Sequence, residues 1–300
     1  FPEFIFSNKI YLTEMETKLA NDVGLDLVHK DRFITAELII KEKTSVNVID
    51  AFAPYLDRTY DRDKLLEIVR QILTAYKNPV KLPYEGKMPV VFVDKDPMPL
   101  SKIIEELNGY KVGTGASLFK DYIGQKKFNE NFTLFQSTEK EDLTSFEFFD
   151  AEGVVNKDFK YPLIEKGRII SPYTDKRTAH KFNLLLTGSA SCDYDTVPTL
   201  SPRNFKVEPS HKTLKELLNG QMGVVVVIAS GGDFTEEGVF GTPVQLAFLT
   251  DGEKLMGRLP ELSLSGELYS MFGEDYLGKS KDEPFFGQKF LALNLDVKYL

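Results

Sequence analysis

The residues that could bind a metal or act as a nucleophile are few and widely separated. The chain contains three histidines and one cysteine. His29, His180 and His211 lie in different segments, and none has a partner at the spacing of a metal site. The single cysteine, Cys192, excludes an internal disulfide and any zinc site built from several cysteines. We therefore expect these residues to bind no metal or cofactor, and we interpret Cys192 as an ordinary loop thiol.

Two adjacent acidic residues in a short predicted helix form the second group with possible chemistry. Glu105 and Glu106 lie in a helix predicted over about residues 100–108, and Tyr110 follows after Gly109. One interpretation is that both carboxylates are solvated on the face of the helix. The other is that they line a polar pocket that still contacts a ligand. Without a metal to lower the pKa of water, a lone glutamate has little nucleophile to activate.

A strand, a turn and a helix must position these glutamates. Residues 89–93 are a continuous apolar run, Pro-Val-Val-Phe-Val, which predicts a buried strand. A turn-rich segment follows, and Asp96 or Ser101 is a candidate N-cap of the helix. We expect Gly109 to end that helix and a second short helix to begin near Ala116.

The rest of the chain is predicted to be rich in strands. Residues 1–60 contain three stretches of β-branched and aromatic residues, and residues 223–297 contain further stretches separated by glycines. The clearest helix is predicted at residues 61–77, where apolar residues recur at three- and four-residue steps after an acidic first turn. The proline-containing residues 78–86 cannot continue this helix, and they predict a boundary.

The composition limits the classes of protein to which this chain can belong. A formal net charge of −8 at pH 7 argues against nucleic-acid binding through a broad basic surface. No apolar run approaches the ~20 residues that a membrane span requires. The chain begins at Phe1 without a signal-like segment, and we expect a processed or trimmed chain. We expect a cytoplasmic location, and a periplasmic one stays open.

The segment around the glutamates resembles the TldD/PmbA family, metallopeptidase-like proteins that are also called modulators of DNA gyrase. Active members carry His-Glu-x-x-x-His on this helix, with two aliphatic residues before it and a glycine before the second histidine. Here residues 103–110 read Ile-Ile-Glu-Glu-Leu-Asn-Gly-Tyr. The two histidine positions therefore hold Glu105 and Tyr110, and Glu106 keeps the general-base position. The family's cysteine ligand falls on or beside Leu277, in the sequence Asp-Tyr-Leu-Gly-Lys.

Two further segments are similar to sequence motifs of the same family. Residues 163–190 match a hairpin turn, a short helix around residues 177–179 (Arg-Thr-Ala) and a Thr-Gly turn. The glycines of residues 223–252 follow the family's C-terminal pattern. The resemblance covers residues 86–300 well and residues 1–60 loosely.

The matched positions lack the chemistry of a zinc site. Zinc in a peptidase needs deprotonatable ligands in a tetrahedral frame with one position left for water. Ligands five residues apart on a regular helix lie about 140° apart, so the glycine before the second ligand is expected to let the chain turn back. A tyrosine hydroxyl is a poor zinc ligand, and leucine cannot coordinate at all. The resemblance thus implies no catalytic residue and no metal, and it leaves four relict site positions: Glu105, Glu106, Tyr110 and Leu277.

The resemblance also implies a fold and a division into domains. The expected fold is α+β and β-rich, with mostly antiparallel sheets or a barrel-like β domain and a few short helices. The N-terminal α/β domain of the family is expected to be absent from this chain. We divide the chain into a central strand-and-helix segment at residues 1–85 and a β-rich C-terminal TldD/PmbA-like domain at residues 86–300.

The family pairs a metal-bearing subunit with a related metal-free subunit, and this chain resembles the second class. The resemblance predicts a pseudoenzyme without activity of its own, a partner subunit or peptide-binding component of a metallopeptidase assembly in proteolysis. Its partner would be a related metal-bearing TldD-like subunit or a second copy of itself, as a hetero- or homodimer, and unfolded peptide is a further candidate. Two alternatives stay open. One is a peptidase or other hydrolase with a rebuilt non-zinc site, and the other is a periplasmic or structural binding module.

Overall fold

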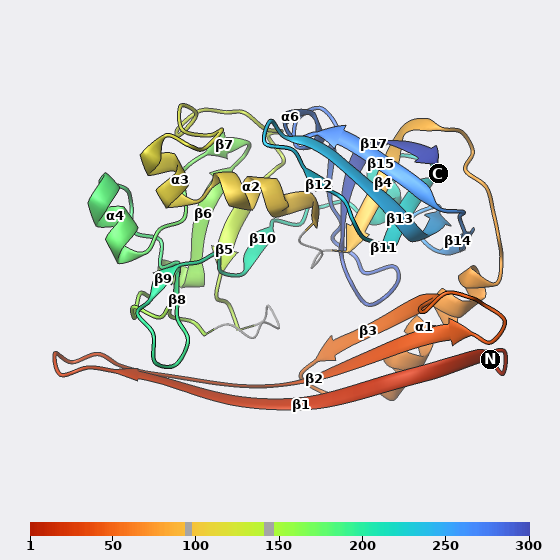
Figure 1. Cartoon of the computed structure of the whole chain (residues 1–300), viewed down its shortest axis with the longest axis horizontal. Coiled ribbons are helices and arrows are strands. Elements are labelled where there is room, and N and C mark those ends of the chain that lie inside the picture. The colour runs from red at the N-terminus through yellow and green to blue at the C-terminus, as the bar shows by residue number, and fades with distance from the viewer. Residues whose placement is uncertain (94–97, 141–146) are drawn as a thin grey trace. The chain divides into compact units, whose positions relative to one another are not determined.

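The computed structural model describes residues 1–93, 98–140 and 147–300, and it divides into two compact units. The expected β-rich α+β fold with a few short helices is confirmed (Figure 1). Each unit is assembled from segments that are distant in the sequence. Unit 1 contains residues Phe1–Leu12, Ile34–Pro99 and Pro209–Leu300, and unit 2 contains Thr13–Phe33 and Leu100–Glu208.

These units differ from the expected division of the chain at residue 85. Strand β4 (Gly86–Val93) follows that point, but its Val91 belongs to the same hydrophobic core as helix α1 (Arg62–Tyr76). Burial of apolar surface therefore joins residues from both sides of residue 85 within unit 1. The domains expected from the sequence are continuous in the chain, whereas each compact unit combines segments from different parts of it.

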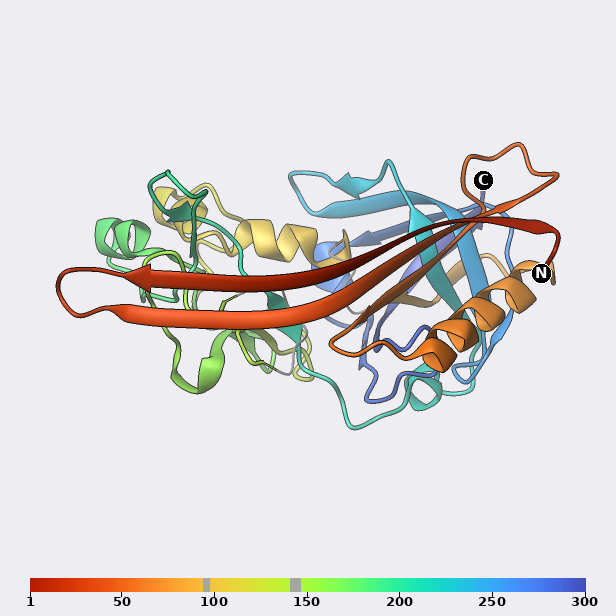
Figure 2. The same ribbon diagram turned by 90° about the horizontal axis from the view of Figure 1, so that it is seen from below.

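A long hairpin contributes to both units. Strands β1 (Phe4–Ala20) and β2 (Asp26–Glu42) have 17 residues each (red and orange in Figure 2). Their tip, Thr13–Phe33, belongs to unit 2, and the remainder belongs to unit 1. Strand β3 (Ala51–Asp57) pairs with β2 in antiparallel register. The expected strands of residues 1–60 are thus confirmed, although they are longer and more continuous than predicted.

Five strands of unit 1 close into a barrel. They pair in the order β11–β4–β17–β15–β13, and β13 pairs back onto β11. The β11–β4 pair is parallel, and the other four pairs are antiparallel. Outside this closed ring, strands β12 and β14 each pair with β13, and β16 pairs with β17. The bounds are β11 Gly223–Ala229, β12 Asp233–Phe234, β13 Val239–Thr250, β14 Leu255–Arg258, β15 Leu262–Glu267, β16 Tyr276–Lys279 and β17 Phe290–Tyr299.

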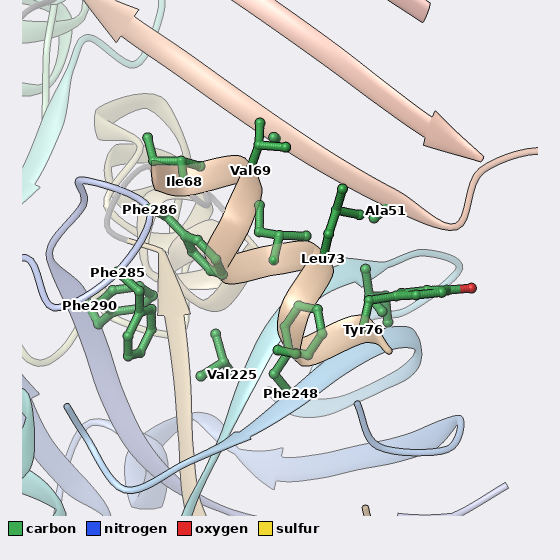
Figure 3. Close-up of a cluster of buried hydrophobic side chains, with 14 of the residues drawn as sticks. Ala51, Ile68, Val69, Leu73, Tyr76, Val225, Phe248, Phe285, Phe286 and Phe290 are labelled. Atoms are coloured by element: carbon green, nitrogen blue, oxygen red, sulfur yellow. The ribbon is translucent and has the colours of Figure 1, made fainter. Parts of the chain in front are cut away.

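Helix α1 joins the β1–β2–β3 sheet to the barrel through one core. Asp61 caps the helix by accepting hydrogen bonds from the backbone N–H groups of Asp63 and Lys64, in agreement with the acidic start predicted for this helix. Figure 3 shows Leu73 close to Ala51 of β3, with Phe248 of the barrel in the same cluster. The helix buries Leu65, Ile68, Val69, Ile72, Leu73, Ala75 and Tyr76. Two further helices of unit 1 are α5 (Leu214–Leu218) and α6 (Leu268–Met271).

Unit 2 is built on a four-stranded antiparallel sheet in the order β10–β5–β6–β7. Its strands and short helices surround a core that includes Phe119, Phe132 and Leu163, all fully buried. Lys166 and Gly167, both with positive φ, form the expected hairpin turn between β6 and β7. The bounds are α2 Ser101–Glu106, α3 Gly109–Thr114, β5 Leu134–Ser137, β6 Lys160–Glu165, β7 Arg168–Ile169, α4 Lys176–Phe182, β8 Ala190–Ser191, β9 Thr199–Leu200 and β10 Phe205–Val207, with 3₁₀ turns at Met98–Leu100 and Lys157–Phe159.

The helix that carries the glutamates is shorter than predicted. Helix α2 ends at Glu106, and the expectation that Gly109 ends it is wrong, because Gly109 is the first residue of α3. The second helix therefore begins well before Ala116. The cause is Asn108, whose side chain accepts hydrogen bonds from the backbone N–H groups of Tyr110 and Lys111 and caps α3.

The N-terminus of α2 also differs from the prediction. The helix continues from the 3₁₀ turn Met98–Leu100, and Leu100, the residue at its N-cap, makes no capping hydrogen bond through its side chain. Ser101 is its first residue rather than its cap, and Asp96 lies outside the described residues. In the described part of the chain, no helix has the length and apolar character needed to cross a membrane.

Candidate functional site

Glu106, which the resemblance places at the family's general-base position, is buried and engaged on both carboxylate oxygens. It is 1% exposed, so the expectation of a solvated residue is wrong for this side chain. Its Oε1 lies 3.0 Å from Lys102 Nζ and 2.7 Å from Lys111 Nζ. Its Oε2 accepts a hydrogen bond from the backbone N–H of Leu118 at 2.7 Å. A carboxylate held in this way has little capacity left to accept a proton from a substrate or water.

The two lysines reach Glu106 from different helices. Lys102 lies one helical turn before Glu106 on α2 and is only 5% exposed, so its ammonium group is paired inside unit 2. Lys111 lies on α3 and is brought back towards α2 by the turn at Asn108. The four-residue spacing of Lys102 and Glu106 is visible in the sequence, whereas the contribution of Lys111 depends on the break between the helices.

Gly109 fixes that break through close packing. Its N–H donates to the carbonyl oxygen of Tyr173 at 2.9 Å, and a Cβ at this position would lie 2.6 Å from the same oxygen. Gly109 is not among the residues with positive φ, so its role is to make room for Tyr173. The expectation that it lets a second ligand turn back towards the first is therefore replaced by a packing role.

Glu105 is the more exposed member of the pair. Its side chain is 51% exposed, as expected for a residue on a helix face, but it is not free. Its Oε2 lies 2.9 Å from Lys102 Nζ, and its Oε1 pairs with Lys111. We call Lys102, Glu105, Glu106 and Lys111 the ion-pair cluster. Two ammonium groups and two carboxylates give the cluster no net charge.

The ion-pair cluster stabilises the charged form of each member. Burial disfavours ionisation of Glu106, but hydrogen bonds from Lys111, Leu118 and Lys102 outweigh it and lower its pKa below 4.5. The pKa of Glu105 is lowered in the same way, against burial, by Lys111 and Lys102. Burial disfavours the charged lysines as well, yet their bonds to both glutamates raise the pKa of Lys102 and of Lys111 above 10.5.

These shifts predict how the cluster contributes to stability as pH changes. A lowered glutamate pKa gives stability that is present above about 4.5 and is lost as pH falls through the folded-state value. A raised lysine pKa gives stability that is present below about 10.5 and is lost as pH rises through the folded-state value. The stability difference between the parent and Glu106→Gln should therefore be largest between these limits and should shrink towards pH 3. Urea titrations at pH 7, 4 and 3 measure it, and a constant difference would contradict the prediction.

Tyr110, at the second histidine position, lines an open pocket of about 520 Å³ within unit 2. It is half-exposed, and its ring meets that of Phe182 edge to face at 5.5 Å between centroids. The ammonium group of Lys181 lies 4.8 Å from the centroid of the Tyr110 ring. Helices α3 and α4 with their N-cap residues supply most of the pocket, and residues 198–200 at β9 complete it. The lining residues are Asn108, Tyr110, Lys111, Asp175, Arg177, Thr178, Lys181, Pro198, Thr199 and Leu200.

Leu277, at the expected position of the cysteine ligand, belongs to unit 1. It lies in β16 and packs partly buried against the core cluster around α1. The following Gly278 has φ +132°, a backbone conformation that side chains rarely adopt. Leu277 therefore acts as an apolar packing residue and offers no atom that could bind a metal.

The remaining candidates are spread over the molecule. His29 lies in β2, His180 in α4 and His211 shortly before α5, and Cys192 is exposed between β8 and β9. Within the described ranges, no three His, Cys, Asp or Glu side chains gather as a metal site requires. Glu105 and Glu106, the acidic residues in the segment that resembles the family's motif, are both paired with lysines.

Comparison with known protein families identifies the family of this chain. A profile described as the PmbA/TldA metallopeptidase C-terminal domain matches residues 85–289, more than half of the chain. The chain belongs to the PmbA/TldD family. The match begins one residue before the start expected for the C-terminal TldD/PmbA-like domain.

Individual PmbA/TldD-like relatives are distant. Metalloprotease MJ0996 of Methanocaldococcus jannaschii is 27% identical over 154 residues, which cover 51% of this chain and 34% of that protein. Uncharacterized protein MJ0231 of the same organism is 22% identical over 269 residues, covering 86% of this chain and 60% of that protein. The chain therefore spans about a third of one relative and three fifths of the other.

Solved structures share the PmbA/TldD fold. TldE from Thermococcus kodakarensis superposes with a TM-score of 0.74 at 20% identity, covering 94% of this chain and 66% of its own. A putative modulator of DNA gyrase from Bacteroides thetaiotaomicron gives a TM-score of 0.72 at 18% identity, covering 99% of this chain and 67% of its own. At these identities, the likeness establishes the fold.

The side chains at the positions that the resemblance assigns to the PmbA/TldD zinc motif do not fit a zinc ion. Glu105 is already paired with two lysines, the Tyr110 hydroxyl is a poor ligand, and Leu277 has no donor atom. The ammonium groups of Lys102 and Lys111 also place positive charge beside Glu106, where a dication would be repelled. The metal chemistry of the family therefore has no support from these residues.

Proposed function

We propose that this chain is a catalytically silent PmbA/TldD protein that serves as the metal-free partner subunit or peptide-binding component of a metallopeptidase assembly. One observation carries the proposal. Glu106, which the resemblance places at the general-base position of the motif, is buried and held by two ammonium groups and a backbone N–H. A general base must reach the proton that it removes, and a buried carboxylate that is already ion-paired is not available for that task.

The partner role is supported by the combination of a preserved frame and a lost site. The family profile still matches across the β-rich part of the chain. The resemblance implies that the family pairs metal-bearing with metal-free subunits. A protein that keeps the fold while a lysine pair neutralises the base position suits the metal-free role.

A hydrolase with a rebuilt non-zinc site is a weaker candidate. Glu105 and Glu106 are the acids that such a site would use, and both have pKa values lowered by lysines. Neither is thus prepared to exchange protons near neutral pH. The role of a periplasmic or structural binding module stays a prediction without a specific supporting contact.

Co-purification with a metal-bearing relative tests the proposed function. The full protein that the gene encodes would be co-expressed with a PmbA/TldD relative from the same organism that retains His-Glu-x-x-x-His. We expect the two proteins to elute together in size-exclusion chromatography at micromolar concentration. Elemental analysis of each separated protein should find zinc near one per chain in the relative and near zero in this protein.

Co-elution tests the partner role, and the zinc content tests the loss of the metal site. Separate elution would contradict the partner role but not the loss of the metal site. About one zinc ion per chain in this protein after dialysis would contradict the silent site itself. The relative with both motif histidines replaced by alanine is the control, because it should lose zinc without any change in this protein.

A further inference from the structure

The pocket between α3 and α4 contains cations that the ion-pair cluster does not neutralise. We propose that this pocket, lined by Tyr110, Arg177 and Lys181, binds a carboxylate group of a peptide. The proposal deepens the peptide-binding part of the proposed function and rests on it. All lining residues belong to unit 2, so the pocket is formed within one compact unit.

Among the residues that the structure describes, two of the three cations that line the pocket have no acidic partner. Lys111 is paired with Glu105 and Glu106. By contrast, no carboxylate of the described residues lies within ion-pair distance of Arg177 or Lys181. The ammonium group of Lys181 instead lies over aromatic rings, 4.8 Å from the centroid of Tyr110 and 5.0 Å from that of Phe182. These two cations can therefore bind an anion without breaking an existing ion pair.

The charge balance of the pocket favours a singly charged ligand. Asp175 is 3% exposed and lines the same pocket, where one of its oxygens accepts the N–H of Thr178 at 2.7 Å. Arg177 and Lys181 supply two positive charges, Asp175 supplies one negative charge, and Lys111 is neutralised within its cluster. One positive charge remains. A carboxylate matches that charge, and a guanidinium group can bind it with two parallel hydrogen bonds.

The other walls of the pocket suit a peptide. Tyr110, Pro198 and Leu200 provide apolar surface next to the cations, and Asn108, Thr178 and Thr199 provide polar groups. A volume of about 520 Å³ lies within the usual range of ligand pockets, which is roughly 300–1,000 Å³. The carboxylate can come from a peptide's C-terminus or from an acidic side chain.

Three unlabelled heptapeptides with acetylated N-termini test the proposal by isothermal titration calorimetry with the full chain at low salt. The first has a free C-terminal carboxylate and no acidic residue, the second is its C-terminal amide, and the third is an amide with one internal glutamate. We expect the first or the third to bind about tenfold or more tightly than the second, because a hydrogen bond to a charged group is worth about that factor. Which of the two binds identifies the source of the carboxylate.

Matched variants locate the site. Arg177→Gln and Lys181→Gln should each remove the preference for the carboxylate, while Lys120→Gln, an exposed lysine of unit 2 outside the pocket, should leave it unchanged. Circular dichroism checks that all three variants are folded. Equal affinity for all three peptides would overturn the carboxylate site and leave peptide binding intact. No binding of any peptide would also contradict the peptide-binding role, and the partner role would still be judged by co-elution.

Discussion

Glu106→Gln is expected to lower the free energy of unfolding by about 3 kcal/mol, because it removes the charge that pairs with a buried lysine. Lys102 is 5% exposed and would keep only its contact with Glu105. Glutamine has nearly the same volume and can still accept the N–H of Leu118, so no cavity adds to the loss. Urea titration followed by circular dichroism at pH 7 measures the change.

Glu105→Gln is the matched control for this prediction. It makes the same chemical change one residue away, within the same ion-pair cluster, but on a side chain that is 51% exposed. Solvent screens such a pair, so we expect a loss of at most about 1 kcal/mol. Equal losses for the two variants would mean that Glu106 is not held as a buried ion pair.

In an assembly with a metal-bearing relative, peptide hydrolysis should depend on the relative's glutamate alone. Replacing the motif glutamate of the relative by glutamine should lower kcat by a factor of about 10²–10⁴, the usual contribution of a general base. Glu105→Gln and Glu106→Gln in this chain should leave kcat unchanged within about twofold, because neither carboxylate is expected to touch the reacting bond. The measurement is the steady-state hydrolysis of a chromogenic peptide by each reconstituted assembly.

Stability and catalysis must be separated in that experiment. Glu106→Gln is assayed well below its unfolding temperature, and co-elution is checked for every variant. A hundredfold fall in kcat for either variant of this chain, with the assembly intact, would support a rebuilt hydrolytic site instead of a silent one.

Under the proposed function, the fold of an enzyme persists here without its chemistry. In a zinc peptidase, the cation beside the motif glutamate is the metal. Here lysine ammonium groups contact that glutamate, one from its own helix and one from the next. In the proposed silent subunit, this contact gives Glu106 a structural role in place of a catalytic one.

Local patterns in the sequence determined the parts of the fold that depend on nearby residues. The apolar repeat of residues 61–77 specified α1, and the apolar runs specified β4 and β11. At the positions that the resemblance assigns, the residue types of Glu105, Tyr110 and Leu277 also predict that the histidine and cysteine ligands are missing, because this depends on residue type and not on geometry. These predictions required no knowledge of distant contacts.

Only the tertiary structure decided what the retained residues do. Asn108 caps a new helix at a position where Gly109 suggested an end, because its side chain satisfies backbone N–H groups that a longer helix would have bonded itself. That break brings Lys111 to Glu106. The two-unit division and the pocket shared by α3, α4 and β9 arise from segments far apart in the sequence. Such contacts leave no periodic signal in a single chain, because they depend on how elements pack and not on the spacing within any one of them.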